Sequence, residues 1–112
     1  MHNRVVLSLI VLGAVSLADA SGADETLALG REVFLRQAQP ACAVCHTLAD
    51  AGSSGTIGPD LDKLAPDEDR IRRAVTSGVG VMPAFEGQLS DEQIAAVARY
   101  VAGVTRKQGG VD

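Results

Sequence analysis

Residues 42–46 read Cys-Ala-Val-Cys-His and hold both cysteines of the chain and one of its two histidines. Two thiols separated by two residues and followed at once by an imidazole form the pattern of covalent c-type haem attachment. One helical turn between the thiols lets both sulfurs reach the two vinyl groups at one porphyrin edge, and the next residue places its imidazole under the iron. The sequence therefore predicts one haem c bound through Cys42 and Cys45, with His46 as an axial iron ligand.

Three other uses of this cysteine pair fit the sequence less well. A redox-active pair belongs on a strand-to-helix turn of an α/β fold, and no segment alternates convincingly enough to predict a strand. A structural zinc site normally needs four Cys or His ligands, whereas the chain beyond residue 20 holds three. A plain disulfide would leave His46 without a role.

Met82 is the candidate for the second axial ligand, by elimination. Met1 and His2 lie in a segment expected to be removed, so His46 and Met82 are the imidazole and the thioether that remain. A His/Met pair is an established way to hold haem iron in electron carriers, and the methionine raises the reduction potential.

The residues around this methionine suit a ligand loop. Pro83 restricts the backbone on both sides of itself, and Gly78 and Gly80 permit a close approach of the chain to the ring. Other interpretations remain: the methionine could fill a gap in the core, Lys63 or Lys107 could bind the iron after losing a proton, or the sixth position could stay open.

Residues 1–20 are predicted to be a cleaved secretory signal peptide. A weakly basic start precedes the nearly apolar run Val5–Leu17, and Ala18-Asp19-Ala20 offers small residues for cleavage. A run of 13 residues is shorter than the roughly 20 that cross a membrane, so a retained anchor is the weaker alternative. The sequence thus predicts one periplasmic domain, residues 21–112, without a membrane span after cleavage.

The charge balance argues against nucleic-acid binding. The chain has 10 basic and 14 acidic residues, and its net charge of −4 is unchanged when Arg4 and Asp19 leave with the signal peptide. Such a domain has no basic field for a phosphate backbone. Its acidic residues are scattered, as on an ordinary solvated surface.

Helical periodicity and capping signals predict an all-α chain with long irregular connections. Apolar residues recur at helical spacing over about 25–37, and a second helix follows from about 66 to the glycine at 78. Ser90 and Gln93 form a capping box that begins a last helix, expected to end near residue 105. The Gly- and Ser-rich stretch 49–60 is predicted to be a loop.

With these motifs in order, the chain resembles the class I cytochromes c. The resemblance runs from Gly30 to about Val104 and is carried by four motifs: CAVCH, GPDL at 58–61, GVGVMPAF at 78–85 and QIAAVARYV at 93–101. It implies the all-α cytochrome c fold, with four to five short helices and long loops wrapped around one covalent haem. It also implies an electron carrier and not an enzyme.

The family pattern assigns further roles to single residues. Pro59 would accept, through its carbonyl, a hydrogen bond from the non-ligating nitrogen of His46, and Leu61 would pack on the ring. Gly30 and Phe34 would cross the C-terminal helix near Tyr100, as packing residues and not as site residues.

A narrower resemblance is to the small monohaem cytochromes that serve bacterial sulfite dehydrogenases. This chain shares their sequence motifs CHTLADAG and GPDLDKL. It implies electron transfer from a dehydrogenase, such as a molybdenum sulfite dehydrogenase, to a terminal oxidase or another cytochrome. The expected haem edge carries neutral residues in place of a ring of lysines; these are Ala41, Ala43, Val79, Val81, Pro83 and Ala84.

Two other functions stay open. The chain could be a haem subunit fixed to an oxidoreductase, or it could be a haem enzyme or gas sensor with a labile sixth ligand. A free carrier would be a monomer, whereas a fixed subunit would be part of a heteromer. Three arginines, Arg70, Arg72 and Arg73, could pair with haem propionates or an acidic partner. We interpret them as a solvated helix face.

Overall fold

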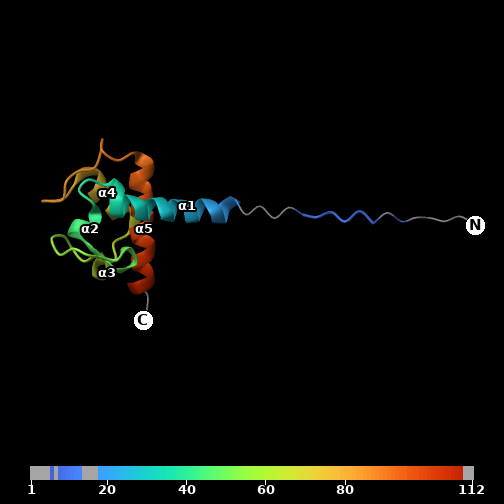
Figure 1. Cartoon of the computed structure of the whole chain (residues 1–112), viewed down its shortest axis with the longest axis horizontal. Helices are drawn as coiled ribbons and strands as arrows, with labels where there is room; N and C mark the ends of the chain where they lie inside the picture. Colours follow the sequence, from blue (N-terminus) through green and yellow to red (C-terminus); the bar gives the residue numbers. More distant parts are fainter. Residues whose placement is uncertain (1–5, 7, 14–17, 110–112) are drawn as a thin grey trace, which may run out of the picture.

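The computed structural model describes residues 6, 8–13 and 18–109, and this part of the chain is mainly helical (Figure 1). The elements in chain order are α1 (Ala18–Glu32), the π-helical η1 (Val33–Gln37), α2 (Cys42–Cys45), β1 (Thr47–Leu48), the 3-10 turn η2 (Ala49–Ala51), β2 (Ser53–Ser54), α3 (Leu61–Leu64), α4 (Glu68–Ser77) and α5 (Asp91–Gly109). The all-α prediction is confirmed, with five α-helices in the described residues.

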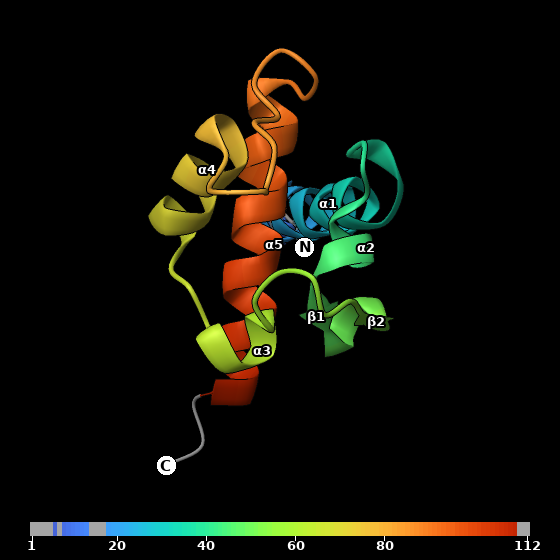
Figure 2. The ribbon, with the colours of Figure 1, turned by 90° about the vertical axis from the view of Figure 1, so that its left-hand side faces the viewer.

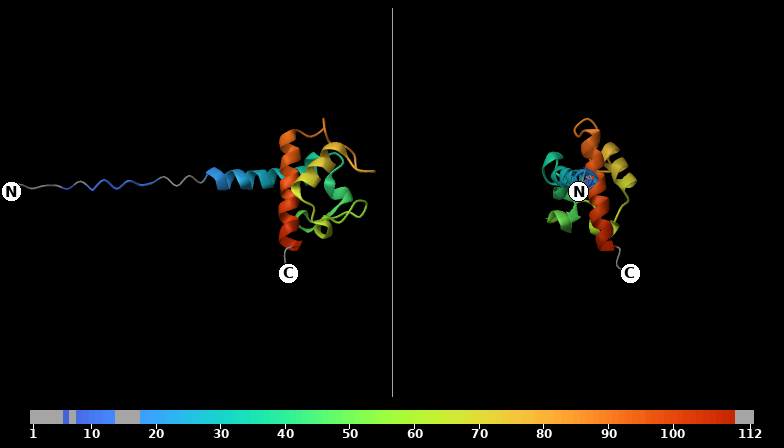
Figure 3. Two further views of the ribbon diagram at one scale, coloured as in Figure 1. Left: turned by 180° about the vertical axis from the view of Figure 1, so that it is seen from behind. Right: turned by 90° about the vertical axis from the view of Figure 1, so that its right-hand side faces the viewer.

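The first and last helices cross each other and form the base of the fold (Figure 3). At the crossing, a Cβ added to Gly30 would lie 2.3 Å from the carbonyl oxygen of Ala96, so only a residue without a side chain fits. Phe34 packs edge-to-face on Tyr100, with 6.3 Å between the ring centroids. Both rings are buried, and they anchor the core formed by η1 and α5.

The remaining elements lie on one side of α5. In the view of Figure 2, α4 is seen to the left of α5 and α2 to its right, with α3 below both. The carboxylate of Asp67 caps α4 by accepting from the Arg70 amide at 2.7 Å, and Gly78 ends the helix at φ 73°. The capping box at α5 has both predicted bonds, because Gln93 N donates to Ser90 Oγ and Ser90 N donates to the Gln93 amide oxygen.

Two helix ends and one expected loop differ from the sequence prediction. Helix α1 begins at Ala18, seven residues before the expected start, and α5 continues to Gly109. The stretch 49–60, expected to be a loop, contains the strand β2, which pairs antiparallel with β1 just before it: Thr47 with Ser54 and Leu48 with Ser53. Its strands are two residues long and carry no readable alternation.

Most of the predicted signal peptide lies outside the described residues, namely positions 1–5, 7 and 14–17. Cleavage after Ala20 therefore stays a prediction. Among the helices that the structure describes, none combines the length and the apolar character needed to cross a bilayer.

Candidate functional site

The motif cysteines sit on the short helix α2. One turn of helix separates Cys42 from Cys45, so both thiols point from one face of the chain, and neither forms a disulfide. Burial, opposed by a backbone hydrogen bond and reinforced by the neighbouring Cys45, raises the pKa of the Cys42 thiol to about 11. A redox-active pair needs a lowered thiol pKa, so this environment argues against a thiol oxidoreductase.

His46 follows α2 and is fixed by its neighbours. Its Nδ1 lies 2.7 Å from the carbonyl oxygen of Pro59. A carbonyl can only accept, so Nδ1 carries the proton and Nε2 keeps its lone pair. Gly58 lies against the ring, since a Cβ there would be 2.6 Å from His46 Cε1.

The hairpin after His46 holds this arrangement in place. Ser53 Oγ donates to the His46 carbonyl at 2.9 Å, and Thr47 Oγ1 donates to the Gly55 carbonyl at 2.9 Å. The Gly58 amide donates to the Cys45 carbonyl at 2.7 Å. These bonds close the chain into a loop around the imidazole.

A buried side chain ties the same loop to α5. Tyr100 is 3% exposed, and its hydroxyl donates to Asp50 Oδ2 at 2.5 Å. Burial and this hydrogen bond raise the pKa of the Tyr100 phenol well above its ordinary value. The long helix thus fixes the loop that carries the imidazole's partner.

Met82 lies on a tight turn between α4 and α5. Its amide donates to the Val79 carbonyl at 2.9 Å, and the Val79 amide donates back to the Met82 carbonyl at 3.1 Å. A Cβ on Gly78 would lie 2.6 Å from that same Met82 carbonyl oxygen, and φ at Gly78 is positive. The Phe85 amide bonds the Val75 carbonyl at 2.8 Å, which fastens the turn to α4.

One apolar cavity of about 410 Å³ brings the predicted site residues together. All six of them line it: Cys42, Cys45, His46, Pro59, Leu61 and Met82. The rest of the wall is mainly aliphatic and aromatic, with contributions from η1, α3, α4, α5 and the Met82 turn. The donor set fits haem c: two unpaired thiols for the vinyl groups, an imidazole of fixed tautomer and a thioether, around an apolar space for the ring.

The spacing of Ile71, Ala74 and Val75 predicts that they share one face of a helix, but the sequence did not assign them to the site. In the structure all three line the cavity from α4. Arg70, which we interpreted from the sequence as part of a solvated helix face, is exposed and also lines the cavity.

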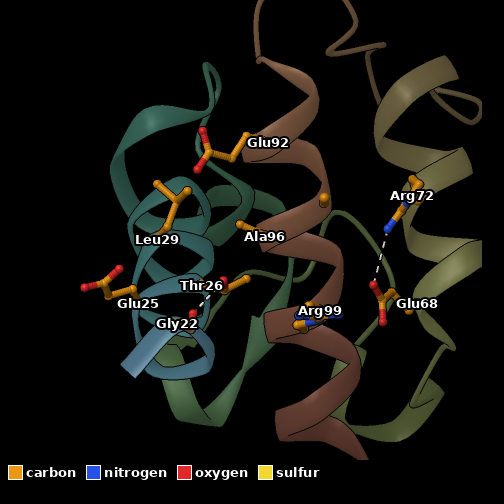
Figure 4. A pocket seen from close by; sticks show the side chains of 10 residues that line it. Gly22, Glu25, Thr26, Leu29, Glu68, Arg72, Glu92, Ala96 and Arg99 are labelled. Carbon is orange, nitrogen blue, oxygen red and sulfur yellow. Dashed lines mark hydrogen bonds and ion pairs between the residues drawn. The ribbon is translucent and has the colours of Figure 1, made fainter. Parts of the chain in front are cut away.

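A second hollow, of about 590 Å³, lies between α1, α4 and α5 (Figure 4). Its wall carries Glu25, Glu92 and Arg99, and Arg72 pairs with Glu68 one turn away on α4 at 3.3 Å. It has no thiol, imidazole or thioether, and its charged wall is unsuited to a porphyrin ring. It is therefore a solvated groove and not the cofactor site.

Among residues 6, 8–13 and 18–109, no group of three or more His, Cys, Asp and Glu side chains is placed to hold a metal ion. Within that part of the chain, the zinc alternative has no further ligands to draw on.

The chain matches the family model described as cytochrome C oxidase, cbb3-type, subunit III, over residues 25–101. It is 39% identical to cytochrome c6 of Tetradesmus obliquus over 85 residues, covering 67% of this chain and 86% of that one. It is 38% identical to chloroplastic cytochrome c6 of Chlamydomonas reinhardtii over 111 residues, covering 90% of this chain and 68% of that one.

A solved structure is more similar in sequence. The c-type cytochrome SorU from Sinorhizobium meliloti is 56% identical and superposes with a TM-score of 0.71. The alignment covers 73% of this chain and 93% of that one.

Proposed function

This chain belongs to the monohaem class I cytochromes c, and on that premise we propose that it is a periplasmic carrier whose iron is held by His46 and Met82 and whose electron donor is a sulfite dehydrogenase. As a member of this family it carries one haem c, bound through Cys42 and Cys45, and transfers electrons without being an enzyme. The axial ligands, the compartment and the partner are the parts that we propose.

The single observation that carries the ligand assignment is the shared cavity. His46 and Met82 both line it, 36 residues apart in sequence, together with the two attachment thiols. Nδ1 of His46 donates to Pro59, so Nε2 is the nitrogen left to bind a metal. Haem c, when bound, supplies a one-electron iron couple.

The wall of the cavity influences the reduction potential of that couple. An apolar surround stabilises the less charged, ferrous state, and a thioether ligand acts in the same sense. With a ligand on each side, the site has no vacancy for a substrate. The residues therefore serve to hold and tune a carrier.

An absorption spectrum of the exported protein tests the ligands. We expect a sharp reduced α-band and, in the oxidised form, a weak methionine-to-iron charge-transfer band. Replacing Met82 by Ala should abolish that charge-transfer band and admit carbon monoxide to the reduced form. A wild-type protein that binds carbon monoxide readily would instead support the gas sensor or haem enzyme.

The surface around the cavity suits a transient protein contact. Val44, Ile57, Val79 and Val81 are between 58% and 90% exposed, and none carries a charge. A small apolar contact, below roughly 1,200 Å² of total buried area, is typical of redox encounters. Because these four exposed side chains are uncharged, we expect association through them to depend weakly on salt.

The proposed donor is supported by the sequence resemblance to cytochromes that serve sulfite dehydrogenases, and the 56% identity to SorU supports a bacterial c-type relative. Stopped-flow reduction by a bacterial molybdenum sulfite dehydrogenase, at low and high salt, tests it. We expect rapid reduction at both. No reduction of a spectrally intact protein would remove the sulfite proposal and leave the carrier.

A haem subunit fixed to an enzyme is the second candidate, because the matching family model is described as an oxidase subunit. Size-exclusion chromatography of the periplasmic extract separates the two. A carrier elutes at the mass of its own domain, whereas a subunit elutes with its enzyme.

A further inference from the structure

One glutamine side chain at the surface joins two segments that are far apart in sequence. Gln88 Nε2 donates to the Gln37 carbonyl at 3.2 Å, and Gln88 Oε1 accepts from the Gln39 amide at 3.3 Å. These partners precede Gln88 by 51 and 49 residues. Ala38 lies between them and is fully buried, so the backbone that Gln88 binds is itself held by the core.

Each of the two joined segments leads directly to a residue of the site. Residues 37–39 are followed by Cys42, which lines the cavity. Gln88 comes six residues after Met82, and its own amide donates to the Phe85 carbonyl at 3.0 Å. Phe85 is 4% exposed and lines the cavity together with Met82. Gln88 thus connects the chain that carries the first thiol to the chain that carries the thioether.

This connection has no substitute among the hydrogen bonds of residues 78–90, which we call the methionine segment. The other hydrogen bonds that leave this segment go to α4 or to the start of α5; the Phe85 and Glu86 amides, for example, donate to α4 carbonyls at 2.8 and 3.4 Å. Among the described residues, only the two Gln88 bonds join the methionine segment to residues 33–48.

Both ends of the Gln88 side-chain amide have a fixed role. A backbone carbonyl only accepts and a backbone amide only donates, so Nε2 faces Gln37 and Oε1 faces Gln39. The side chain of Gln37 is held from α5, because its Oε1 accepts from Gln93 Nε2 at 2.9 Å. A glutamate at position 88 would have the same size, but it would set a carboxylate oxygen against the Gln37 carbonyl, where neither group can donate.

We propose that Gln88 is a positioning residue for Met82. A thioether stays on the iron only while the segment that carries it stays in place, because other ligands compete for the same position. The Gln88 bonds hold the methionine segment to the thiol-bearing chain and so make displacement of the thioether less favourable. This role rests on the proposed ligation by His46 and Met82, and it is independent of the electron donor.

Titration of the oxidised holoprotein with imidazole at neutral pH tests this role. Imidazole exchanges with the thioether: the sulfur–iron bond breaks, a nitrogen–iron bond forms, and the oxidation state is unchanged. The haem absorption measures binding, and loss of the methionine-to-iron charge-transfer band identifies the broken bond. We expect Q88E to raise the apparent affinity for imidazole about fivefold, which corresponds to the loss of about one net hydrogen bond.

Q39E is the matched control for this titration. It adds the same charge on the same surface, but the Gln39 side chain donates to the Arg36 carbonyl on its own segment and not to the methionine segment. Its imidazole affinity should match that of the wild type. An affinity of Q88E that does not exceed that of Q39E would overturn the positioning role.

The same titration in an M82A background separates positioning from a general loss of stability. M82A has no thioether to displace, so Q88E should no longer change the imidazole affinity; an equal effect with and without Met82 would refute the proposal. If Q88E does not mature with haem, Q88A carries the test, since it loses both bonds without adding a charge, and a wild-type affinity for Q88A would then be the refutation. An M82A protein that binds imidazole no more tightly than the wild type would instead remove the proposed Met82 ligation.

Discussion

Replacing Tyr100 by Phe should destabilise the holoprotein while leaving the ring packing intact. The change removes the hydroxyl that donates to Asp50 and keeps the contact with Phe34. Hydrogen bonds to charged groups contribute about 1.5–3 kcal/mol. Because Asp50 is exposed and water can replace the lost donor, we expect a loss below this range, about 1 kcal/mol. For a domain of this size that lowers Tm by about 4–8 °C.

The pH dependence of the protein's stability provides a second test of the hydrogen bond between Tyr100 and Asp50. Burial and the bond to Asp50 raise the folded pKa of Tyr100, so the folded state holds the phenolic proton more tightly than the unfolded chain. The contribution is fully present below the unfolded pKa of about 10, and is lost as the pH rises above it. The stability gap between wild type and Y100F should therefore narrow above pH 10.

Urea unfolding followed by the haem absorption, at pH 7 and pH 10.5, measures both effects. A double-mutant cycle with D50A isolates the pair, and we expect a coupling of about 1 kcal/mol at pH 7. Additive single changes, or a gap that is constant with pH, would refute the reasoning.

Three further changes test other parts of the fold. G30A places a Cβ 2.3 Å from the α5 backbone and should lower the free energy of unfolding by about 3 kcal/mol. G103A is the control: nothing lies within 4 Å of its Cβ, so it should raise that free energy by about 0.5–1 kcal/mol. Thermal unfolding measures both, and equal effects would contradict the close crossing. G58A should push the His46 ring aside and reduce the yield of low-spin haem in the absorption spectrum, and a normal spectrum would count against the tight contact. S90A should cost about 1 kcal/mol of unfolding free energy by urea titration, and no loss would show that the cap is dispensable.

The parts of the fold that the sequence predicted are those set by local chemistry. The caps of α4 and α5 are read from Asp67, Gly78, Ser90 and Gln93, because each acts within one helical turn. The fold class was predicted from the resemblance to class I cytochromes c, whose motifs this chain has in the same order.

The missed elements are short and depend on side-chain hydrogen bonds that leave no periodic pattern in the sequence. Helix α3 has four residues, and it is stabilised by Asp60 capping its own amides and by Asp62 accepting from the Ala49 amide at 2.8 Å. The hairpin is held by the side chains of Thr47 and Ser53. No periodicity records such bonds.

The sequence predicted those site residues for which the composition offers few candidates. It did not predict the residues whose place in the site depends on how α4 is rotated about its axis. One mature histidine and one mature methionine limit the candidates for the axial ligands, whose roles stay predictions. By contrast, three arginines share one turn of α4, and which of them faces the cavity depends on the rotation that buries Ile71 and Val75.

The position of α5 after all the predicted haem-binding residues in sequence has a consequence for biosynthesis. Val97 and Val101 of this helix close one wall of the cavity, and its backbone receives α1 at Gly30. A nascent polypeptide that has emerged only as far as Ser90 already holds both thiols, the imidazole and the thioether, yet lacks the wall against which they assemble. The helix that completes the pocket is thus made after all four of these side chains.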